Sequence, residues 1–257
     1  GQTIASTAIG SILDNDNAPT IAITGPATID EAAGIATYTI TLSNPSSTAI
    51  SVDYATANGS ATAGNDYTAT TGSVSFGPGE TSKTITVPIT NDTLFEGNES
   101  YSITLTNPSS NASIDNTQQS VTTVITDNDS APTVIVTGET ITEGDTLDFS
   151  VALSNPSATA TTVALTLNSG TATVGTDTTT PVQVSVDGGS SFTNVFVNLD
   201  GTFNVSVPAN STQGIIVRVP TVNDTIDEPT ETISLSASAP GQTIASTAIG
   251  SILDNDN

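Results

Sequence analysis

The residues in this sequence with clear chemical potential are carboxylates and side-chain amides that recur in short runs. The triplet Asp-Asn-Asp stands at 14–16, 127–129 and 254–256, and further acids lie in NDTLFEGNE from Asn91 and NDTIDEPTE from Asn223. Oxygen ligands of this kind suit hard cations, and Ca²⁺ takes roughly six to eight of them. The chain has no His and no Cys, the ligands that zinc, copper and iron favour. The pattern therefore predicts calcium sites.

The strongly acidic charge balance limits the classes of molecule that the chain can bind. Asp and Glu together number 26 against two basic residues, Lys83 and Arg218, for a formal net charge of -24. We expect no nucleic-acid binding, because that affinity comes from cations that displace counterions, and an anionic membrane surface would repel the chain. Bound divalent ions would relieve the repulsion among clustered carboxylates. No apolar run is long enough to cross a membrane and no basic leader is present, so we expect no membrane insertion and an export signal outside this sequence.

Two repeats organise the chain. The first 17 residues recur letter for letter as residues 241–257, which indicates an array with a period of 240 residues. Within that period DNDNAPTIAITG from Asp14 matches DNDSAPTVIVTG from Asp127. Glu31 pairs with Glu143 at an offset of 112, whereas Asn91 pairs with Asn223 at an offset of 132. The second copy therefore carries about 20 extra residues.

These offsets predict the domain organisation. Residues 1–17 are expected to be the C-terminal strand and linker of a preceding repeat, and residues 18–130 a first sandwich domain. Residues 131–257 are expected to be a second sandwich with its insertion of about 20 residues between 178 and 222. Because residues 1–17 duplicate the last strand, they could also pair with another molecule in its place.

Alternation of apolar residues with Thr or Ser supplies the strand signal. YTITLS from Tyr38, KTITVPI from Lys83 and YSITLT from Tyr101 have the period of two expected of half-buried strands. The sequence predicts about seven strands per domain, in the first near 20–24, 36–43, 49–57, 72–76, 82–89, 100–107 and 120–126. In the second, VQVSVDGGSSF from Val182 and FNVSV from Phe203 are interpreted as one or two added hairpins. The expected fold is all-β, with two tandem immunoglobulin-like antiparallel β-sandwiches.

In such a sandwich the first, third and fifth connections and the end of the last strand share one pole, where the acids of both domains collect. Lone acids such as Asp66 and Asp177 are more typical of turn formers. Repulsion among the remaining acids favours a shared cation. The predicted calcium ligands are Asp14, Asp16, Glu31, Asn58, Asn91, Asp92, Glu96, Glu99, Asp127, Asn128, Asp129, Glu143, Asn223, Asp224, Glu228, Glu231, Asp254 and Asp256.

The stretch VDYATANGSATAGNDYTATTGSVSFGPGETSKTITVPITNDTLFEGNESYSITLTNPSS, closed by VTTVITDND, resembles the Calx-beta domain. That family is a calcium-binding sandwich found in sodium/calcium exchangers, an integrin and very large bacterial adhesins. The second domain resembles the family only at its ends and at NDTIDEPTE, and Ser169 stands at the position of Asn58. The resemblance implies a first-domain calcium site formed by Glu31, Asn58, Asn91, Asp92, Glu96, Glu99, Asp127, Asn128 and Asp129.

The array also resembles the extender region of RTX-type adhesins, and DNDNAP is similar to cadherin linkers. We therefore expect a calcium-stiffened extracellular stalk of a bacterial surface adhesin, possessing no catalytic role, with neighbouring repeats of the same chain as partners and an adhesion target that the sequence does not give. Paired carboxylates can hydrolyse glycosides, but no nucleophile and base accompany them here. The alternatives are a calcium sensor, or glycan or protein binding by the insertion. For the insertion, alternating neighbours favour core burial of Phe192, Phe196 and Phe203.

Overall fold

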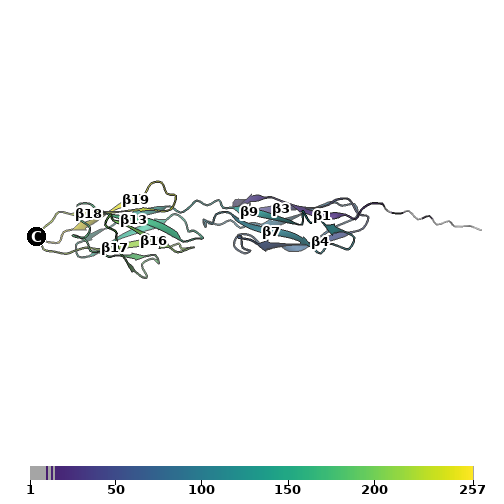
Figure 1. Cartoon of the computed structure of the whole chain (residues 1–257). Coiled ribbons are helices and arrows are strands. Elements are labelled where there is room, and N and C mark those ends of the chain that lie inside the picture. The colour runs from purple at the N-terminus through teal and green to yellow at the C-terminus, as the bar shows by residue number, and fades with distance from the viewer. Residues whose placement is uncertain (1–9, 11–12, 14, 257) are drawn as a thin grey trace, which may run out of the picture. The chain divides into compact units, whose positions relative to one another are not determined.

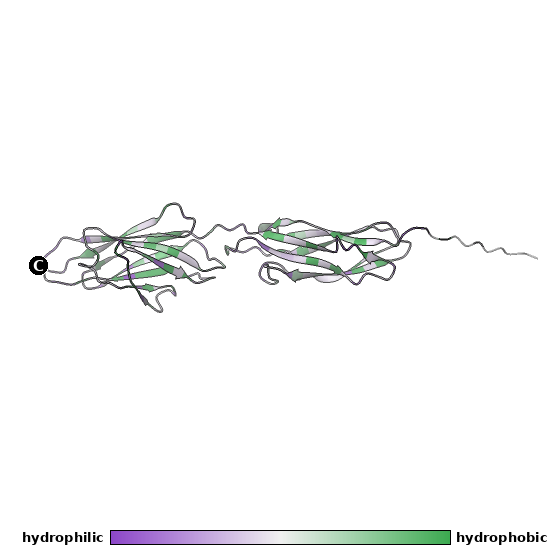
Figure 2. Cartoon of the chain, in the orientation of Figure 1, coloured by the Kyte–Doolittle hydropathy of each residue, from purple (hydrophilic) through white to green (hydrophobic). Residues whose placement is uncertain are grey.

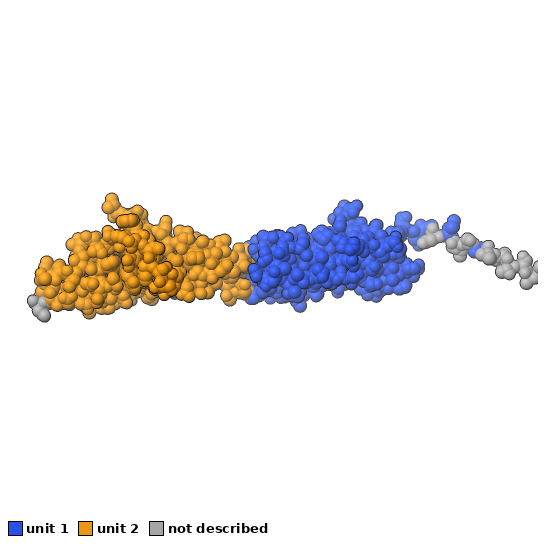
Figure 3. Space-filling model, turned by 90° about the horizontal axis from the view of Figure 1, so that it is seen from below, with its two compact units in different colours: residues 1–91, 98–126 blue, residues 92–97, 127–257 orange. Residues whose placement is uncertain are grey.

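A computed structural model describes residues 10, 13 and 15–256. The chain forms two compact units, coloured separately in Figure 3. The first contains Gly1–Asn91 and Asn98–Thr126, and the second contains Asp92–Gly97 and Asp127–Asn257. The chain therefore passes from one unit to the other three times, and each unit is described below by itself. The predicted domain boundary after residue 130 stays a prediction.

The first unit is a two-sheet sandwich (Figure 1). Its longer strands follow one another along the chain as the alternating runs predicted. One sheet has the strand order β6-β3-β1-β8 and the other β2-β9-β7-β4-β5. Neighbours pair antiparallel except β1 with β8 and β2 with β9, which pair parallel. Its elements are β1 (Thr20–Thr24), β2 (Thr28–Asp30), the 3-10 helix η1 (Glu31–Ala33), β3 (Ile35–Leu42), β4 (Ile50–Asn58), β5 (Thr71–Phe76), β6 (Ser82–Pro88), β7 (Glu99–Thr106), β8 (Ser113–Ile114) and β9 (Ser120–Thr126).

The core of this unit lies between the sheets, and alternate residues of each strand fill it (Figure 2). Burial alternates along β3, for example, because successive side chains of a strand point to opposite faces. Tyr38 is fully buried, and its hydroxyl lies 2.7 Å from that of Tyr101 and 2.6 Å from that of Thr123. These hydrogen bonds remove the cost of burying the hydroxyls. The thin core therefore gains volume from tyrosine without leaving unpaired polar atoms at these positions.

The second unit repeats this plan with a larger sheet. The strand orders are β10-β12-β17-β14-β15 and β11-β19-β18-β13-β16. All pairs are antiparallel except β11 with β19. Its strands are β10 (Val134–Thr137), β11 (Thr140–Thr142), β12 (Thr146–Leu153), β13 (Thr161–Ser169), β14 (Val182–Ser185), β15 (Thr193–Val195), β16 (Thr202–Val207), β17 (Ile215–Pro220), β18 (Glu231–Ser238) and β19 (Ser246–Leu253). The prediction of two all-β sandwiches is confirmed. No helix among the described residues is long and apolar enough to span a membrane.

The insertion forms one added hairpin and not two. Strand β14 pairs with β15 and also with β17, so the hairpin extends the edge of a sheet. The FNVSV segment lies in β16, which pairs with β13 as β5 pairs with β4, so its interpretation as an added hairpin was wrong. Burial of the three phenylalanines was predicted, but only Phe203 is buried, at 5% exposure. Phe192 is half-buried and Phe196 is 78% exposed.

Arg218 links the added hairpin to the sheet. Its guanidinium donates to both carboxylate oxygens of Asp148 at 2.9 Å and lies 4.0 Å from the centre of the Phe192 ring. Lysine keeps the charge but cannot reproduce either the paired hydrogen bonds or the stacking. We expect Arg218→Lys to lower the free energy of unfolding by about 1 kcal/mol and to speed amide exchange in β14 and β15. Lys83→Ala, which breaks the more exposed pair with Glu80, should lower the free energy of unfolding by less than Arg218→Lys does. Urea titration followed by circular dichroism would measure both.

Candidate metal centre

A parallel strand pair positions the acidic site of the second unit. The register of β11 and β19 places Thr142 opposite Leu253. Since both strands run in the same direction, both end at the same edge, and the next residues are Glu143 and Asp254. The Glu143 N–H donates to the Leu253 carbonyl at 2.9 Å, which continues the ladder by one residue. The sequence pattern thus brings an acid from near the start of the unit beside the triplet at its end.

Three carboxylates meet there. Oxygen atoms of Glu143, Asp254 and Asp256 all lie within 4.8 Å of one another. Glu143 is 9% exposed, and two of the oxygens, Glu143 Oε1 and Asp256 Oδ2, are buried without a hydrogen-bond partner among the described residues. Buried carboxylate oxygens are costly unless paired. A hard cation would satisfy both, so this donor set fits Ca²⁺.

Neighbouring amides and turns hold the site together. Asn255 Nδ2 donates to the Glu143 carbonyl at 3.3 Å and to Asn223 Oδ1 at 3.1 Å. Gly144 has a φ of +82°, and a Cβ there would come within 2.9 Å of the Asn223 side chain. Glycine at this position therefore permits the close approach of the Glu143 turn to the loop that follows β17. Asn255 was not among the predicted ligands, and its place inside the recurring triplet was the available signal.

More acids surround the three carboxylates. Burial raises the pKa of the Glu143 carboxyl, and the charges of Asp254, Asp256 and Asp224 raise it further. Burial likewise raises the pKa of Glu228, with Asp224, Asp177 and Asp254 adding to the effect. The pKa of Glu231 is raised by burial and then by Asp177, Glu228, Glu143 and Asp224. The shared causes of these shifts mean that Asp224, Glu228, Glu231 and Asp254 lie near Glu143.

These raised pKa values set a pH dependence for the metal-free protein. A carboxyl whose pKa is higher in the folded state than in the unfolded chain binds its proton more tightly when folded. Its stabilising contribution is therefore present at low pH and is lost as pH rises from the unfolded value, near 4.5, through the folded one. We expect the metal-free second unit to lose stability as pH rises above 4.5, and Glu143→Gln to flatten this dependence. Urea titrations in EDTA across that range would measure it; a steeper dependence in the variant would contradict it.

The lone acids behave as turn formers. Asp66 Oδ2 accepts the Thr62 N–H at 2.6 Å, and Asp177 Oδ2 accepts the Thr173 N–H at the same distance. Each carboxylate thus closes a loop four residues back along the chain. This contact is the one expected of a turn former, but Asp177 also lies close enough to Glu228 and Glu231 to raise their pKa values.

Asn58, a predicted ligand, also takes part in local structure. Its Oδ1 accepts the Ala63 N–H at 3.0 Å and the Tyr67 hydroxyl at 2.6 Å. In the second unit Ser169 Oγ accepts the Val174 N–H at 3.0 Å, so serine reproduces the backbone contact. Asn58 as a calcium ligand stays a prediction.

The predicted ligands of the first repeat divide between the two units. Glu31, Asn58, Asn91 and Glu99 belong to the first, and Asp92, Glu96, Asp127, Asn128 and Asp129 to the second. Glu31 is buried, at 5% exposure, at the start of η1. Asp14 lies outside the described residues, and Asp16 is exposed. Their roles as ligands stay predictions.

Within the second unit, the Asp127 carboxylate organises the residues around it. Its Oδ2 accepts the N–H groups of Glu96 and Gly97 at 3.0 and 2.9 Å, and its Oδ1 accepts that of Asp129 at 2.9 Å. The Oδ2 of Asp129 is buried without a hydrogen-bond partner among the described residues, as Asp256 Oδ2 is. In each triplet, therefore, the Oδ2 atom of the third residue is a buried acceptor that a cation could satisfy.

The acidic turns before β7 and β18 also share their local geometry. Asp92 Oδ1 accepts the Leu94 N–H at 2.7 Å, and Asp224 Oδ1 accepts the Ile226 N–H at 2.8 Å. The same turn is therefore built twice from the same Asn-Asp-Thr start.

Comparison with curated protein sequences gives short matches. Sodium/calcium exchanger 1 of Canis lupus familiaris is 48% identical over 56 residues, which is 22% of this chain and 6% of that protein. The protein of the same name from Mus musculus is 46% identical over 61 residues, 24% of this chain and 6% of that protein. Sodium/calcium exchanger 3 of Homo sapiens is 48% identical over 56 residues, again 22% and 6%. The chain thus spans a small fraction of these curated relatives.

Among solved structures, the apo-form Calx CBD1 domain is similar at 29% identity with a TM-score of 0.40, covering 43% of this chain and 99% of that one. CBD12 from CALX1.2 is similar at 22% identity with a TM-score of 0.42, covering 87% and 83%. The comparison with protein families identifies which residues of this chain match. Residues 14–130, which include every strand of the first sandwich, match the profile of the Calx-beta domain.

Proposed function

We propose that this chain is a calcium-binding structural module, in which Ca²⁺ joins the acidic ends of strands and loops at one pole of each sandwich. The observation that carries the proposal is that the buried oxygens Glu143 Oε1 and Asp256 Oδ2, beside Asp254, have no hydrogen-bond partner in the part of the chain that the structure describes. The two ion pairs found among the described residues, Lys83 with Glu80 and Arg218 with Asp148, involve none of these three carboxylates. The resemblance of residues 14–130 to the Calx-beta domain supports the same conclusion for the first sandwich.

In the second unit, Glu143, Asp254 and Asp256 would hold the ion, and the charge of nearby Asp224 helps to raise the pKa of Glu143, Glu228 and Glu231. A bound divalent cation supplies positive charge that offsets this repulsion. The protein's own residues contribute position. The β11–β19 ladder aligns two of the ligands, and Asn255 ties them to the loop at Asn223. Ion binding would thus cross-link three segments distant in sequence.

We further propose that the module acts as a repeated, non-catalytic spacer in an extracellular adhesin of a bacterial surface, with neighbouring repeats as its partners. The 17-residue identity between the two ends of the sequence supports an array. A sensor role is less consistent with near-identical repetition. Affinity separates the two, because sensors bind calcium at roughly 10⁻⁷ to 10⁻⁵ M and extracellular modules near 10⁻⁴ to 10⁻³ M.

Calorimetric titration of the calcium-free chain tests the proposal. We expect saturable calcium binding in the weaker of those ranges, accompanied by a rise in melting temperature because the ion binds the folded state. Magnesium at the same concentration is the control, and it should bind more weakly, since it demands a tighter octahedral site. Absence of any heat or thermal shift at millimolar calcium would contradict the proposal. Affinity near 10⁻⁷ M would favour a sensor.

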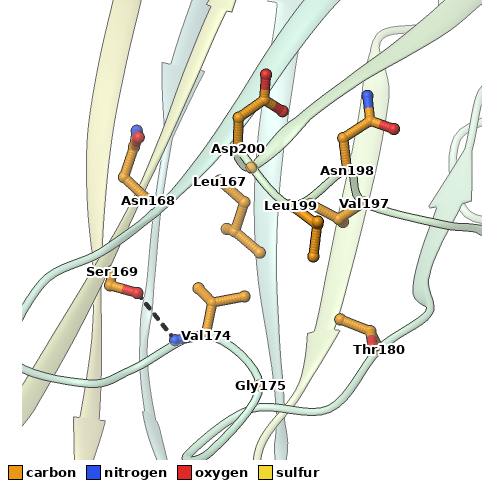
Figure 4. A pocket seen from close by; sticks show the side chains of 11 residues that line it. Leu167, Asn168, Ser169, Val174, Gly175, Thr180, Val197, Asn198, Leu199 and Asp200 are labelled. Atoms are coloured by element: carbon orange, nitrogen blue, oxygen red, sulfur yellow. Dashed lines mark hydrogen bonds between the residues drawn. The ribbon is translucent and has the colours of Figure 1, made fainter.

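A second function, ligand binding by the insertion, is favoured by exposed apolar side chains. Phe196 is 78% exposed and Leu199 is fully exposed. Leu199 lines a pocket of about 500 Å³ whose apolar side chains Leu167 and Val174 point toward it, while the Asp200 carboxylate points away (Figure 4). Binding of a glycan or protein ligand that is lost in Phe196→Ser and Leu199→Ser would favour this function over the spacer role.

A further inference from the structure

A short backbone pairing joins two loops within the second unit. Phe95, in the segment Asp92–Gly97, forms a parallel bridge with Ser157. The Phe95 N–H donates to the Pro156 carbonyl at 3.2 Å, and the Ala158 N–H donates to the Phe95 carbonyl at 2.9 Å. Ser157 itself is buried, with 6% of its surface exposed. The loop after β12 is therefore a receptor for the backbone of an acidic turn.

The first unit contains the same receptor loop, because Ser43-Asn44-Pro45-Ser46 repeats Ser154-Asn155-Pro156-Ser157. Asn44 Nδ2 donates to the Asn17 carbonyl at 3.1 Å, and Asn155 Nδ2 donates to the Ser130 carbonyl at 3.0 Å. In both loops an asparagine thus ties the turn to the segment that enters the sandwich.

The next residues of the two loops also correspond. Ser46 Oγ accepts the Thr48 N–H at 3.1 Å, and Ser157 Oγ accepts the Thr159 N–H at 3.3 Å. The Ser46 carbonyl accepts the Gly79 N–H at 2.9 Å, and the Ser157 carbonyl accepts the Asn210 N–H at 2.8 Å. Both Gly79 and Asn210 have positive φ, so even the supporting turns match. The receptor geometry of the second unit is therefore already formed in the first.

The two receptors differ in what covers them. Ser157 is buried and Ala158 is half-buried, whereas their counterparts Ser46 and Ser47 are half-buried and exposed. In the first unit the loop lines an open groove of about 940 Å³, whose other walls come from Asp16 to Pro19, Pro78, Gly79 and Asn111. The loop in this groove thus repeats the hydrogen bonds of the loop at Pro156–Ala158, but among the described residues no acidic turn forms a bridge with it.

The sequence indicates which turn belongs there. Residues 1–17 are identical to residues 241–257, so the segment that enters the first sandwich is the segment that ends the second. The acidic turn of the second sandwich, NDTIDEPTE, is the counterpart of NDTLFEGNE and places Asp227 at the position of Phe95. Asp227 is exposed, and Ile226 beside it is 59% exposed. A preceding copy of the second sandwich would carry this turn toward the groove.

We propose that the groove at Asn44–Thr48 binds the acidic turn of the second sandwich of another copy of this chain. Asp227 of that copy would donate its N–H to the Pro45 carbonyl and accept the Ser47 N–H. The recognition is through the backbone, which explains why aspartate can stand where the internal pair has phenylalanine. The inference rests on the proposed array, since it requires a repeat before this one, but it does not require a bound cation.

Hydrogen exchange in a two-copy chain tests this docking. Residues 1–257 followed directly by residues 18–257 preserve the period of 240, and a peptide spanning Ser43 to Ala49 then occurs twice. Only the downstream groove has a preceding repeat. We expect two isotope envelopes of equal intensity for this peptide, with the Ser47 amide exchanging roughly tenfold more slowly in one of them. The single chain should give one envelope, at the fast position.

Substitution of the upstream turn provides matched variants. Asp227→Pro in the first copy removes the N–H donor and should merge the two envelopes at the fast position. Asp227→Ala keeps the donor and should leave both envelopes. Unchanged exchange in β18 would show that the variant sandwich remains folded. A single envelope in the unsubstituted two-copy chain would overturn the docking, and if that chain still bound calcium, the proposed function would stand without it.

Discussion

Glu143→Gln is expected to change stability in opposite directions with and without calcium. The metal-free variant should be more stable than the unsubstituted chain, because burial and neighbouring acids raise the pKa of Glu143 and make its charge unfavourable. With calcium present, the same change removes the negative charge of one ligand, and the affinity for calcium should fall at least about tenfold. At a calcium concentration 100 times the original dissociation constant, the stabilisation by calcium would drop from about 2.7 to about 1.4 kcal/mol.

The position of the tyrosines allows this measurement to be assigned to one unit. All four, Tyr38, Tyr54, Tyr67 and Tyr101, lie in the first unit, so tyrosine fluorescence follows its unfolding while circular dichroism follows both. The effect of Glu143→Gln should appear in circular dichroism alone. Glu139→Gln is the matched control: it makes the same charge change in the same unit, and the amide oxygen can still accept the Asp148 N–H. Equal effects of the two substitutions would contradict a calcium role for Glu143.

Phe149→Ala should destabilise the second unit by about 3 to 5 kcal/mol. Phe149 is fully buried in β12, and the backbone around it is packed closely. A Cβ built on Gly250 would lie 2.9 Å from Phe149 Cζ, and one on Gly138 would lie 3.0 Å from Phe149 Cε1. Removing the ring therefore leaves a cavity whose rigid backbone walls resist collapse.

Ile135→Ala provides the control for this cavity. Ile135 lies in β10 of the same sheet but is 65% exposed, so its loss should change the free energy of unfolding by no more than about 0.5 kcal/mol. Urea unfolding followed by circular dichroism gives both values, and the tyrosine transition should not move for either variant. A loss below about 1 kcal/mol in Phe149→Ala would mean that the site repacks.

The strands were predictable from the sequence because their chemistry is repetitive. YTITLS from Tyr38 places Tyr38, Ile40 and Leu42 on one face, and all three are buried. The two-sheet architecture followed because each such strand has only one apolar face to cover. The minor parallel pairs of β1 with β8 and β2 with β9 were not predicted. Strands of two or three residues, such as β8 and β2, are too short to show an alternating pattern in the sequence.

The insertion was predicted less well for a related reason. The alternation around Phe192 and Phe196 is that of a strand, but β15 ends at Val195 and has only one neighbour, β14. Phe196 follows the end of this edge strand and is 78% exposed. Sequence periodicity reports which side chains share a face, but burial of that face depends on what lies opposite.

The meeting of Glu143 with Asp254 and Asp256 could be predicted, because the first connection of such a sandwich and the end of its last strand share one pole. The hydrogen bonds that individual side chains make within their own loops could not be predicted. Asn58 accepts hydrogen bonds from Ala63 and Tyr67, and this depends on the path of a loop that spacing does not define. The receptor loop at Asn44 was visible as a repeated Ser-Asn-Pro-Ser, but that string is also typical of ordinary turns.

The parallel pairs at the ends of each sandwich determine how it would respond to being pulled. In the second unit β11 lies near the start and β19 at the end, and they run side by side in the same direction. Tension applied through the two ends of the chain would draw these strands past each other along their length, so their hydrogen bonds would have to break together. Antiparallel partners pulled in the same way would separate like a zip, one bond at a time. Mechanical strength under traction is thus built into the strand directions themselves.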